Sequence, residues 1–116
     1  MAISLYGGQA RPESFGMNEV ADRHGFAVCY PQGERDGRGK TCWNVGYPFQ
    51  ADMTVDDVRF LTELIRHLAK EHRLSRRNVF CTGMSNGGDM CYLLASRCPE
   101  VYAALGPVAG VMSVEI

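Results

Sequence analysis

The sequence predicts a single α/β domain with three layers, in which helices flank a parallel four-stranded sheet. Apolar runs of strand length alternate along the chain with longer stretches of helical periodicity. The connections between these runs are long enough for a helix, and such crossovers join parallel strands in a right-handed sense. Residues 1–116 contain no repeat, low-complexity tract or break in composition, so we expect one domain.

The chain is expected to begin with a strand, a helix and a second strand. Residues 2–6 form a short apolar run, and residues 12–23 carry a partial apolar stripe that predicts a helix. His24 and Gly25 follow, and a glycine at this position often ends a helix. Residues 26–30 are continuously apolar and of strand length, so they predict the second strand.

Residues 31–53 predict a long irregular segment with many glycines and a mixed charge cluster at residues 34–40. A loop of this length in a compact domain is either functional or disordered. Trp43, Tyr47 and Phe49 favour a second half that packs against the domain. Trp43 and Tyr47 either line a site for an acyl group or a sugar, or cap the hydrophobic core.

The rest of the chain is expected to form a helix, a strand, a helix and a last strand. Thr54 to Asp57 resemble a capping box with an acidic first turn, and the helix continues to about Arg73. Its apolar face has three-and-four spacing, at Val58, Leu61, Leu64, Ile65 and Leu68. The remaining elements are a strand at residues 77–82, a helix at 89–96 and a strand at 103–109.

The stretch from Gly83 to Gly88 has the pattern Gly-x-Ser-x-Gly between an apolar strand and a helix. Strand, sharp turn and helix form the context of a nucleophile elbow. The turn would project the Ser85 hydroxyl from the sheet, and small flanking residues would let strand and helix approach. The backbone amide of Asn86 and the helix dipole would then stabilise an oxyanion. The alternative is a glycine-rich turn with an incidental serine.

Composition and charge argue against several classes of function. The chain is 46% hydrophobic and 22% charged, and its net charge of −1 argues against nucleic acid or an anionic membrane as partner. No run reaches the ~18 apolar residues of a membrane span, and no signal peptide is visible in residues 1–10. The five cysteines form no zinc-type cluster with histidine, so we expect neither metal nor cofactor. The redox compartment stays open.

Four blocks of sequence occur in a characteristic order: residues 21–33, 42–44 and 56–60, and the motif around Ser85. Together they resemble the polyhydroxybutyrate-depolymerase and feruloyl-esterase-like branch of the α/β-hydrolases. The resemblance implies a serine hydrolase of carboxylic esters, on small molecules, polyesters or plant cell-wall polysaccharides. Members of this branch are often secreted or periplasmic, and the location of this chain is left open.

The resemblance also implies a strand order. The first strand would be central, with the second on one side and the third and fourth on the other, which creates a topological switch point beside Ser85. The loop after the first strand would face Ser85 and supply a second oxyanion donor from Gly8 or Gln9. Tyr6 stands where the family usually has a histidine, and it joins the two loop aromatics as a candidate for the substrate pocket.

The catalytic set of this family is incomplete in the sequence. In this fold an acid and then a histidine follow the serine, but no histidine follows Ser85. His24, His67 and His72 lie near helix ends that are expected at the opposite edge of the sheet. The chain therefore resembles the central piece of a hydrolase, truncated at both ends.

Three explanations of proton transfer remain open: a group from a second subunit, water or a carboxylate of this chain, or weak hydrolysis supported by the oxyanion site alone. The candidate carboxylates are Asp36, Asp52 and Asp89. The two outer strands would form apolar edges, which favours a homodimer or higher homo-oligomer in which elements could be exchanged. The alternatives to an esterase are a fragment that only oligomerises or binds a ligand, and a weak hydrolase of other esters such as phosphoesters.

Overall fold

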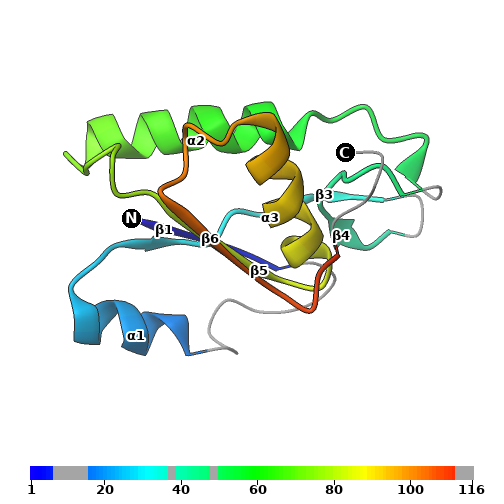
Figure 1. Ribbon diagram of the computed structural model, residues 1–116. Helices are drawn as coiled ribbons and strands as arrows, with labels where there is room; N and C mark the ends of the chain where they lie inside the picture. Colours follow the sequence, from blue (N-terminus) through cyan, green and yellow to red (C-terminus); the bar gives the residue numbers. More distant parts are fainter. Residues whose placement is uncertain (7–15, 37–38, 48–49, 112–116) are drawn as a thin grey trace.

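A parallel sheet of four strands organises the domain. The computed structural model describes residues 1–6, 16–36, 39–47 and 50–111. The sheet contains, in spatial order, β2 (Val28–Cys29), β1 (Ala2–Leu5), β5 (Phe80–Met84) and β6 (Ala104–Val108) (Figure 1). All its strand pairs are parallel, and Leu5 of β1 lies opposite Gly83 of β5. The expected strand order, with the switch point between β1 and β5, is confirmed.

Helices lie on both faces of the sheet. α1 (Met17–His24) lies on one face, and α2 (Asp57–Glu71) and α3 (Asn86–Arg97) lie on the other (Figure 1). The predicted three-layer α/β class is therefore confirmed, and residues 12–15 of the first expected helix lie outside the described residues. None of the helices in the described part of the chain combines the length and apolar character that a membrane span needs.

The hydrophobic core lies between the sheet and the pair of helices α2 and α3. Its side chains with at most 3% exposure include Ile3, Leu5, Leu61, Ile65, Met90 and Leu94. Leu61 and Ile65 belong to the predicted apolar face of α2 and lie one turn apart. Burying each such side chain contributes about 1.5–3 kcal/mol, so this interface fixes where α3 starts relative to the sheet.

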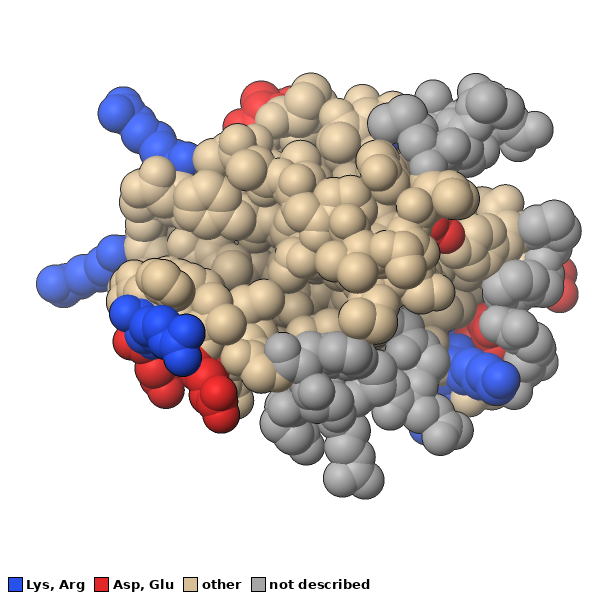
Figure 2. Space-filling model, turned by 60° about the horizontal axis from the view of Figure 1, so that its bottom comes forward, with Lys and Arg blue, Asp and Glu red and all other residues tan. Residues whose placement is uncertain are grey.

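The face of the sheet that carries α1 is only partly covered. An apolar pocket of about 500 Å³ lies between α1 and the β5–β6 pair, with Val20, Phe80 and Gly106 among its walls. Phe80 is 42% exposed and Val20 is 40% exposed. Charged residues on this side of the molecule lie toward its margins (Figure 2). The domain therefore presents an apolar surface beside α1.

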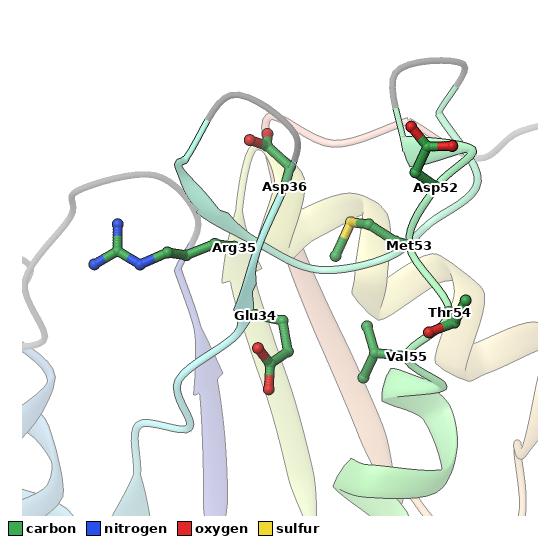
Figure 3. Close-up of a pocket in the computed structure, with 7 residues that line it drawn as sticks. All are labelled: Glu34, Arg35, Asp36, Asp52, Met53, Thr54 and Val55. Carbon is green, nitrogen blue, oxygen red and sulfur yellow. The ribbon is translucent and has the colours of Figure 1, made fainter.

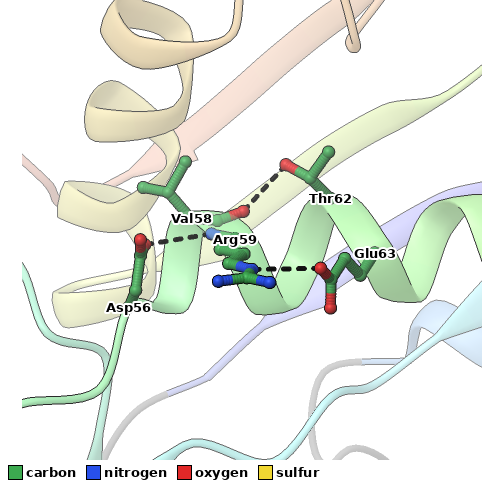
Figure 4. A network of polar contacts seen from close by, with 5 residues as sticks. All are labelled: Asp56, Val58, Arg59, Thr62 and Glu63. Carbon is green, nitrogen blue, oxygen red and sulfur yellow. Dashed lines mark hydrogen bonds and ion pairs between the residues drawn. The ribbon is translucent and has the colours of Figure 1, made fainter.

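α2 begins at a cap formed by Asp56. The Asp56 carboxylate accepts a hydrogen bond from the Arg59 amide at 3.0 Å (Figure 4). The predicted capping box that starts at Thr54 is wrong. Asp57, its expected acidic partner, is 3% exposed and instead accepts a hydrogen bond from the Asn44 amide at 2.7 Å. The acidic first turn thus connects the helix to the preceding loop.

The long segment after β2 contains a small hairpin that the sequence did not predict. β3 (Glu34–Arg35) and β4 (Thr41–Cys42) pair in antiparallel fashion, with Glu34 opposite Cys42. Each strand has two residues, and both residues of β3 are exposed and charged. No apolar run marks such a strand, which is why the segment was expected to be irregular.

A buried glutamine organises the loop after β4. Gln50 is 2% exposed, and its side-chain oxygen accepts hydrogen bonds from the amides of Val45 and Tyr47 at 3.0 and 3.1 Å. Its side-chain nitrogen donates to the Trp43 carbonyl at 2.7 Å. The described part of the loop therefore packs down as expected, through polar side chains as well as through Trp43, and Phe49 lies outside the described residues.

Candidate active site

Ser85 lies on the turn that joins β5 to α3. β5 ends at Met84 and α3 begins at Asn86, so one residue makes the turn from strand to helix. Ser85 has φ 55° and ψ −113°, a conformation that costs a residue with a side chain about 1–3 kcal/mol. The residue is exposed. The predicted order of strand, tight turn and helix is present, with the serine at the surface.

Two backbone hydrogen bonds hold this conformation. The Ser85 amide donates to the Val108 carbonyl of β6 at 2.9 Å. The Ser85 carbonyl accepts from the Asp89 amide at 2.9 Å, which is the first hydrogen bond of α3. Both ends of the strained residue are therefore tied to regular structure.

Glycine is required around this turn because backbones come into contact there. A Cβ on Gly83 would meet the backbone of Gly87, and a Cβ on Gly87 would meet the carbonyl of Leu5 in β1. A Cβ on Gly88 would lie 2.8 Å from the Val108 carbonyl oxygen. The start of α3 thus rests directly on the ends of three strands, the close approach that the motif predicts.

Two tyrosines lie at the same edge of the sheet as Ser85. Tyr6 directly follows β1 and Tyr30 directly follows β2, so both are at the carboxyl ends of parallel strands. Their rings stack with centroids 6.1 Å apart and planes 20° apart. The Tyr30 hydroxyl donates to the Asn18 side-chain oxygen of α1 at 2.6 Å. The half-buried Tyr6 therefore belongs to the strand end beside Ser85, on the other side of the switch point.

Trp43 lies in the hydrophobic core. Its side chain is fully buried, so it offers no surface to a ligand, and the core-capping alternative is the one that fits its position. Its backbone contacts the helix that begins after Ser85. The Trp43 amide donates to Asn86 Oδ1 at 2.7 Å, and the Trp43 carbonyl accepts from Asn86 Nδ2 at 3.1 Å.

Tyr47 and Asp89 make a second connection between this loop and α3. The Tyr47 hydroxyl donates to one carboxylate oxygen of Asp89, and the other oxygen accepts from the Val111 amide at 2.7 Å. Burial, and then the hydrogen bond with Asp89, raise the pKa of Tyr47 to about 12. The half-buried Tyr47 therefore stays protonated at neutral pH and keeps donating to Asp89.

The two other candidate carboxylates border a separate pocket of about 500 Å³ (Figure 3). It is lined by Glu34, Arg35, Asp36, Asp52, Met53, Thr54 and Val55. Figure 3 shows Asp36 and Asp52 on different loops at one end of this pocket. Asp36 is buried and accepts from the Lys40 amide at 3.2 Å. Of the three candidates, only Asp89 lies on the helix that begins after Ser85.

The three histidines lie away from Ser85. His72 lines a pocket with Met1 at the amino-terminal edge of the sheet, opposite the turn. His67 and His24 are exposed and lie near the carboxyl ends of α2 and α1. All three histidines belong to the described residues, and none of them lies at the carboxyl edge of the sheet.

Gly8 and Gln9, the expected second oxyanion donors, lie outside the described residues.

The described part of the chain holds no group of three His, Cys, Asp or Glu side chains that could bind a metal ion. The five cysteines all lie in the described ranges, and no disulfide joins any two of them. The sulfur atoms of Cys81 and Cys91 lie 3.5 Å apart, and this contact together with burial raises the pKa of Cys81.

Comparison with known proteins decides the family. The model of the family described as esterase PHB depolymerase matches residues 5–116. The chain belongs to this family. The predicted resemblance to the esterase branch of the α/β-hydrolases is thereby confirmed.

Two relatives of this chain are named as a depolymerase and an esterase. The chain is 25% identical over 113 residues to poly(3-hydroxyalkanoate) depolymerase C of Paucimonas lemoignei. The aligned region covers 95% of this chain and 27% of the relative. The chain is also 31% identical over 96 residues to acetylxylan esterase A of Talaromyces purpureogenus, covering 80% of this chain and 24% of the relative. It thus spans about a quarter of the length of these two proteins.

A solved structure supports the fold. The acetyl xylan esterase from Aspergillus awamori superposes with a TM-score of 0.77 at 21% sequence identity. The match covers 95% of this chain and 41% of that chain. The fold described here is therefore also found within a larger solved structure.

Replacing Gly87 with alanine is expected to destabilise the domain by about 1–3 kcal/mol, because the new methyl group would overlap the Leu5 carbonyl. Urea unfolding of Gly87→Ala measures this change. Gly106→Ala is the matched control, because a Cβ there would meet only Thr82 Oγ1 at 3.8 Å. Equal unfolding midpoints for the two variants would contradict the close contact between α3 and β1.

Tyr47 is expected to make stability fall at high pH. Its pKa is 10.0 in the unfolded chain and about 12 in the folded one, so the folded state binds more protons between these values. The contribution is complete below pH 10 and lost as pH rises through 12. Unfolding of the wild type and Tyr47→Phe across this range measures the difference. Asp89→Asn should lower the pKa of Tyr47, so that tyrosinate absorbance appears at a lower pH than in the wild type.

Proposed function

We propose that this chain carries the nucleophile of a carboxylic ester hydrolase and that Ser85 is that nucleophile. The observation that carries the proposal is the exposed serine at φ 55° between β5 and α3, in a chain of an esterase family. A strained residue with both backbone groups tied down is a costly feature, and such residues cluster at active sites.

The proposed reaction is acyl transfer to the serine followed by hydrolysis. The Ser85 oxygen attacks the acyl carbon, and the alcohol leaves when the tetrahedral intermediate collapses. The Asn86 amide belongs to the first turn of α3, where N–H groups have no partner within the helix. It is the proposed first donor to the oxyanion, with Gly8 or Gln9 as the second. Water then cleaves the acyl-serine.

The proton acceptor is proposed to come from a second copy of the chain or from water. The three histidines lie away from the turn. Asp89 already accepts hydrogen bonds from Tyr47 and Val111, which occupy both of its oxygens. Proton transfer by a positioned base contributes about 10²–10⁴-fold, so a single copy should turn over slowly.

The proposed substrates are carboxylic esters of small molecules or of polysaccharides. The named relatives act on poly(3-hydroxyalkanoate) or acetylxylan, both neutral esters. Tyr6 and Tyr47 are half-buried and approach the turn from β1 and from the loop, so they are the proposed walls of the substrate site. Trp43 supports this site from the core.

Self-association is proposed to use the apolar surface beside α1. Phe80 and Val20 are exposed there around a pocket. Pairing along the edge of β6 that faces away from β5 is less favourable than the apolar sequence of this strand indicates. The Val108 carbonyl points toward β5, so the neighbouring Pro107 points toward the outer edge, where it provides no N–H.

Hydrolysis of p-nitrophenyl acetate by the wild type and Ser85→Ala tests the proposed function. Loss of the hydroxyl should lower the rate at least about tenfold, because no acyl-serine can form. Mass spectrometry should find the acetyl group on a peptide containing Ser85. Ser96→Ala, on the exposed end of the same helix, is the control and should keep the wild-type rate. Equal rates for wild type and Ser85→Ala would favour a non-catalytic, ligand-binding chain.

A further inference from the structure

Asn86 uses its whole side-chain amide to hold the backbone of one residue. Asn86 Oδ1 accepts from the Trp43 amide at 2.7 Å, and Asn86 Nδ2 donates to the Trp43 carbonyl at 3.1 Å. The two residues are 43 positions apart in the sequence. A planar side chain bonded at both ends cannot rotate about its last torsion without breaking at least one of these hydrogen bonds.

The residue that Asn86 holds is itself fixed. The Trp43 indole is fully buried in the core. The Trp43 carbonyl accepts a second hydrogen bond from Gln50 at 2.7 Å, and Gln50 is 2% exposed. Asn86 is therefore attached to a rigid part of the domain and not to a mobile surface loop.

A second side chain on the same turn of α3 repeats this arrangement. Asp89 accepts from the Tyr47 hydroxyl and from the Val111 amide. The first turn of α3 is thus bonded to the loop after β4 on one side and to the segment after β6 on the other. These contacts surround the strained Ser85 without involving its hydroxyl.

We propose that Asn86 is a positioning residue, whose side chain fixes the orientation of its own backbone amide toward the oxyanion. The proposal rests on the function proposed above for Ser85. The orientation of the Ser85–Asn86 peptide plane is set at one end by the ψ of Ser85, −113°, and at the other end by the anchored Asn86. Because a misplacement of about 1 Å can cost 10²-fold in rate, the anchor should matter for acyl transfer.

The side chain itself is a poor candidate for direct contact with the substrate. Both of its polar atoms are engaged by Trp43. Asn86 also forms a hydrogen bond with Tyr47 that lowers the pKa of Tyr47, against the larger effects of burial and of Asp89. Its influence on the reaction would therefore pass through the backbone.

The test compares acylation by p-nitrophenyl acetate in Asn86→Ala, Asn86→Asp and the wild type. Asn86→Ala removes both hydrogen bonds and should lower the maximal acylation rate about 10–100-fold, with the half-saturating ester concentration unchanged. Exchange of the Trp43 backbone amide with solvent should become faster. Asn78→Ala, at an exposed residue two positions before β5 begins, is the matched control and should leave the rate unchanged.

Asn86→Asp gives a readout that loss of stability would not produce. The new carboxylate can accept from the Trp43 amide but cannot donate to its carbonyl, and its charge opposes the oxyanion. Protonation restores a donor and removes the charge, so the rate relative to wild type should rise as pH falls from 7 to about 4. Tyr47 and Asp89, the titratable groups that adjoin Asn86, are present in both proteins, so the ratio of rates cancels their common contribution.

The outcomes separate the two proposals. If Ser85→Ala lowers acylation but neither Asn86 variant does, the positioning role is overturned while the nucleophile stands. If Ser85→Ala has no effect, the proposed function itself fails. Circular dichroism must show folded variants, and if Asn86→Ala does not fold, the pH-dependent rate ratio of Asn86→Asp decides.

Discussion

The contact between the Gly87 backbone and the Leu5 carbonyl is the constraint on which this structure depends. It lets the first turn of α3 rest on the end of β1. Gly83 allows the same close approach to β5, because it has no side chain to collide with the Gly87 backbone. A helix that begins so close to the sheet must start within one residue of the strand, and this forces Ser85 to positive φ. The serine is then left at the carboxyl edge of the sheet, exposed, at the switch point where open α/β sheets bind ligands.

Polar side chains, rather than an apolar face, connect the long loop to this turn. Gln50, Asp57 and Asn86 each accept a hydrogen bond from a backbone amide in the stretch from Trp43 to Tyr47. A single hydrogen bond adds only about 1 kcal/mol net, but leaving a buried amide unpaired costs about 1–3 kcal/mol. The network therefore contributes more to selecting one loop conformation than to overall stability. It holds the Trp43 side chain in the core and Tyr47 against Asp89.

Local patterns predicted the sheet and the turn, because apolar runs and glycine spacing reflect burial and close backbone contact directly. They did not predict the β3–β4 hairpin, whose β3 residues, Glu34 and Arg35, are charged and exposed. The cap of α2 was expected at Thr54 with Asp57 as its partner, whereas the structure has Asp56 as the cap. The sequence does not distinguish two adjacent aspartates, and only burial shows that Asp57 binds the Asn44 amide of the loop. The pairing of Asn86 with Trp43 spans 43 residues between polar and aromatic side chains, so no periodicity reveals it. Likewise, only burial shows that Trp43 cannot line the proposed substrate site.

The arrangement separates two requirements of ester hydrolysis. Stabilising an oxyanion needs donors that are already oriented, and one such donor contributes about 3–4 kcal/mol. On the proposed function, the turn and the anchored start of α3 meet this requirement with groups of the chain itself. Proton transfer needs a base within hydrogen-bond reach, and the histidines lie toward the other edge of the sheet. On this proposal the donors belong to the backbone while the base is brought to the edge, so the proposed oxyanion site stays formed even where proton transfer limits the rate.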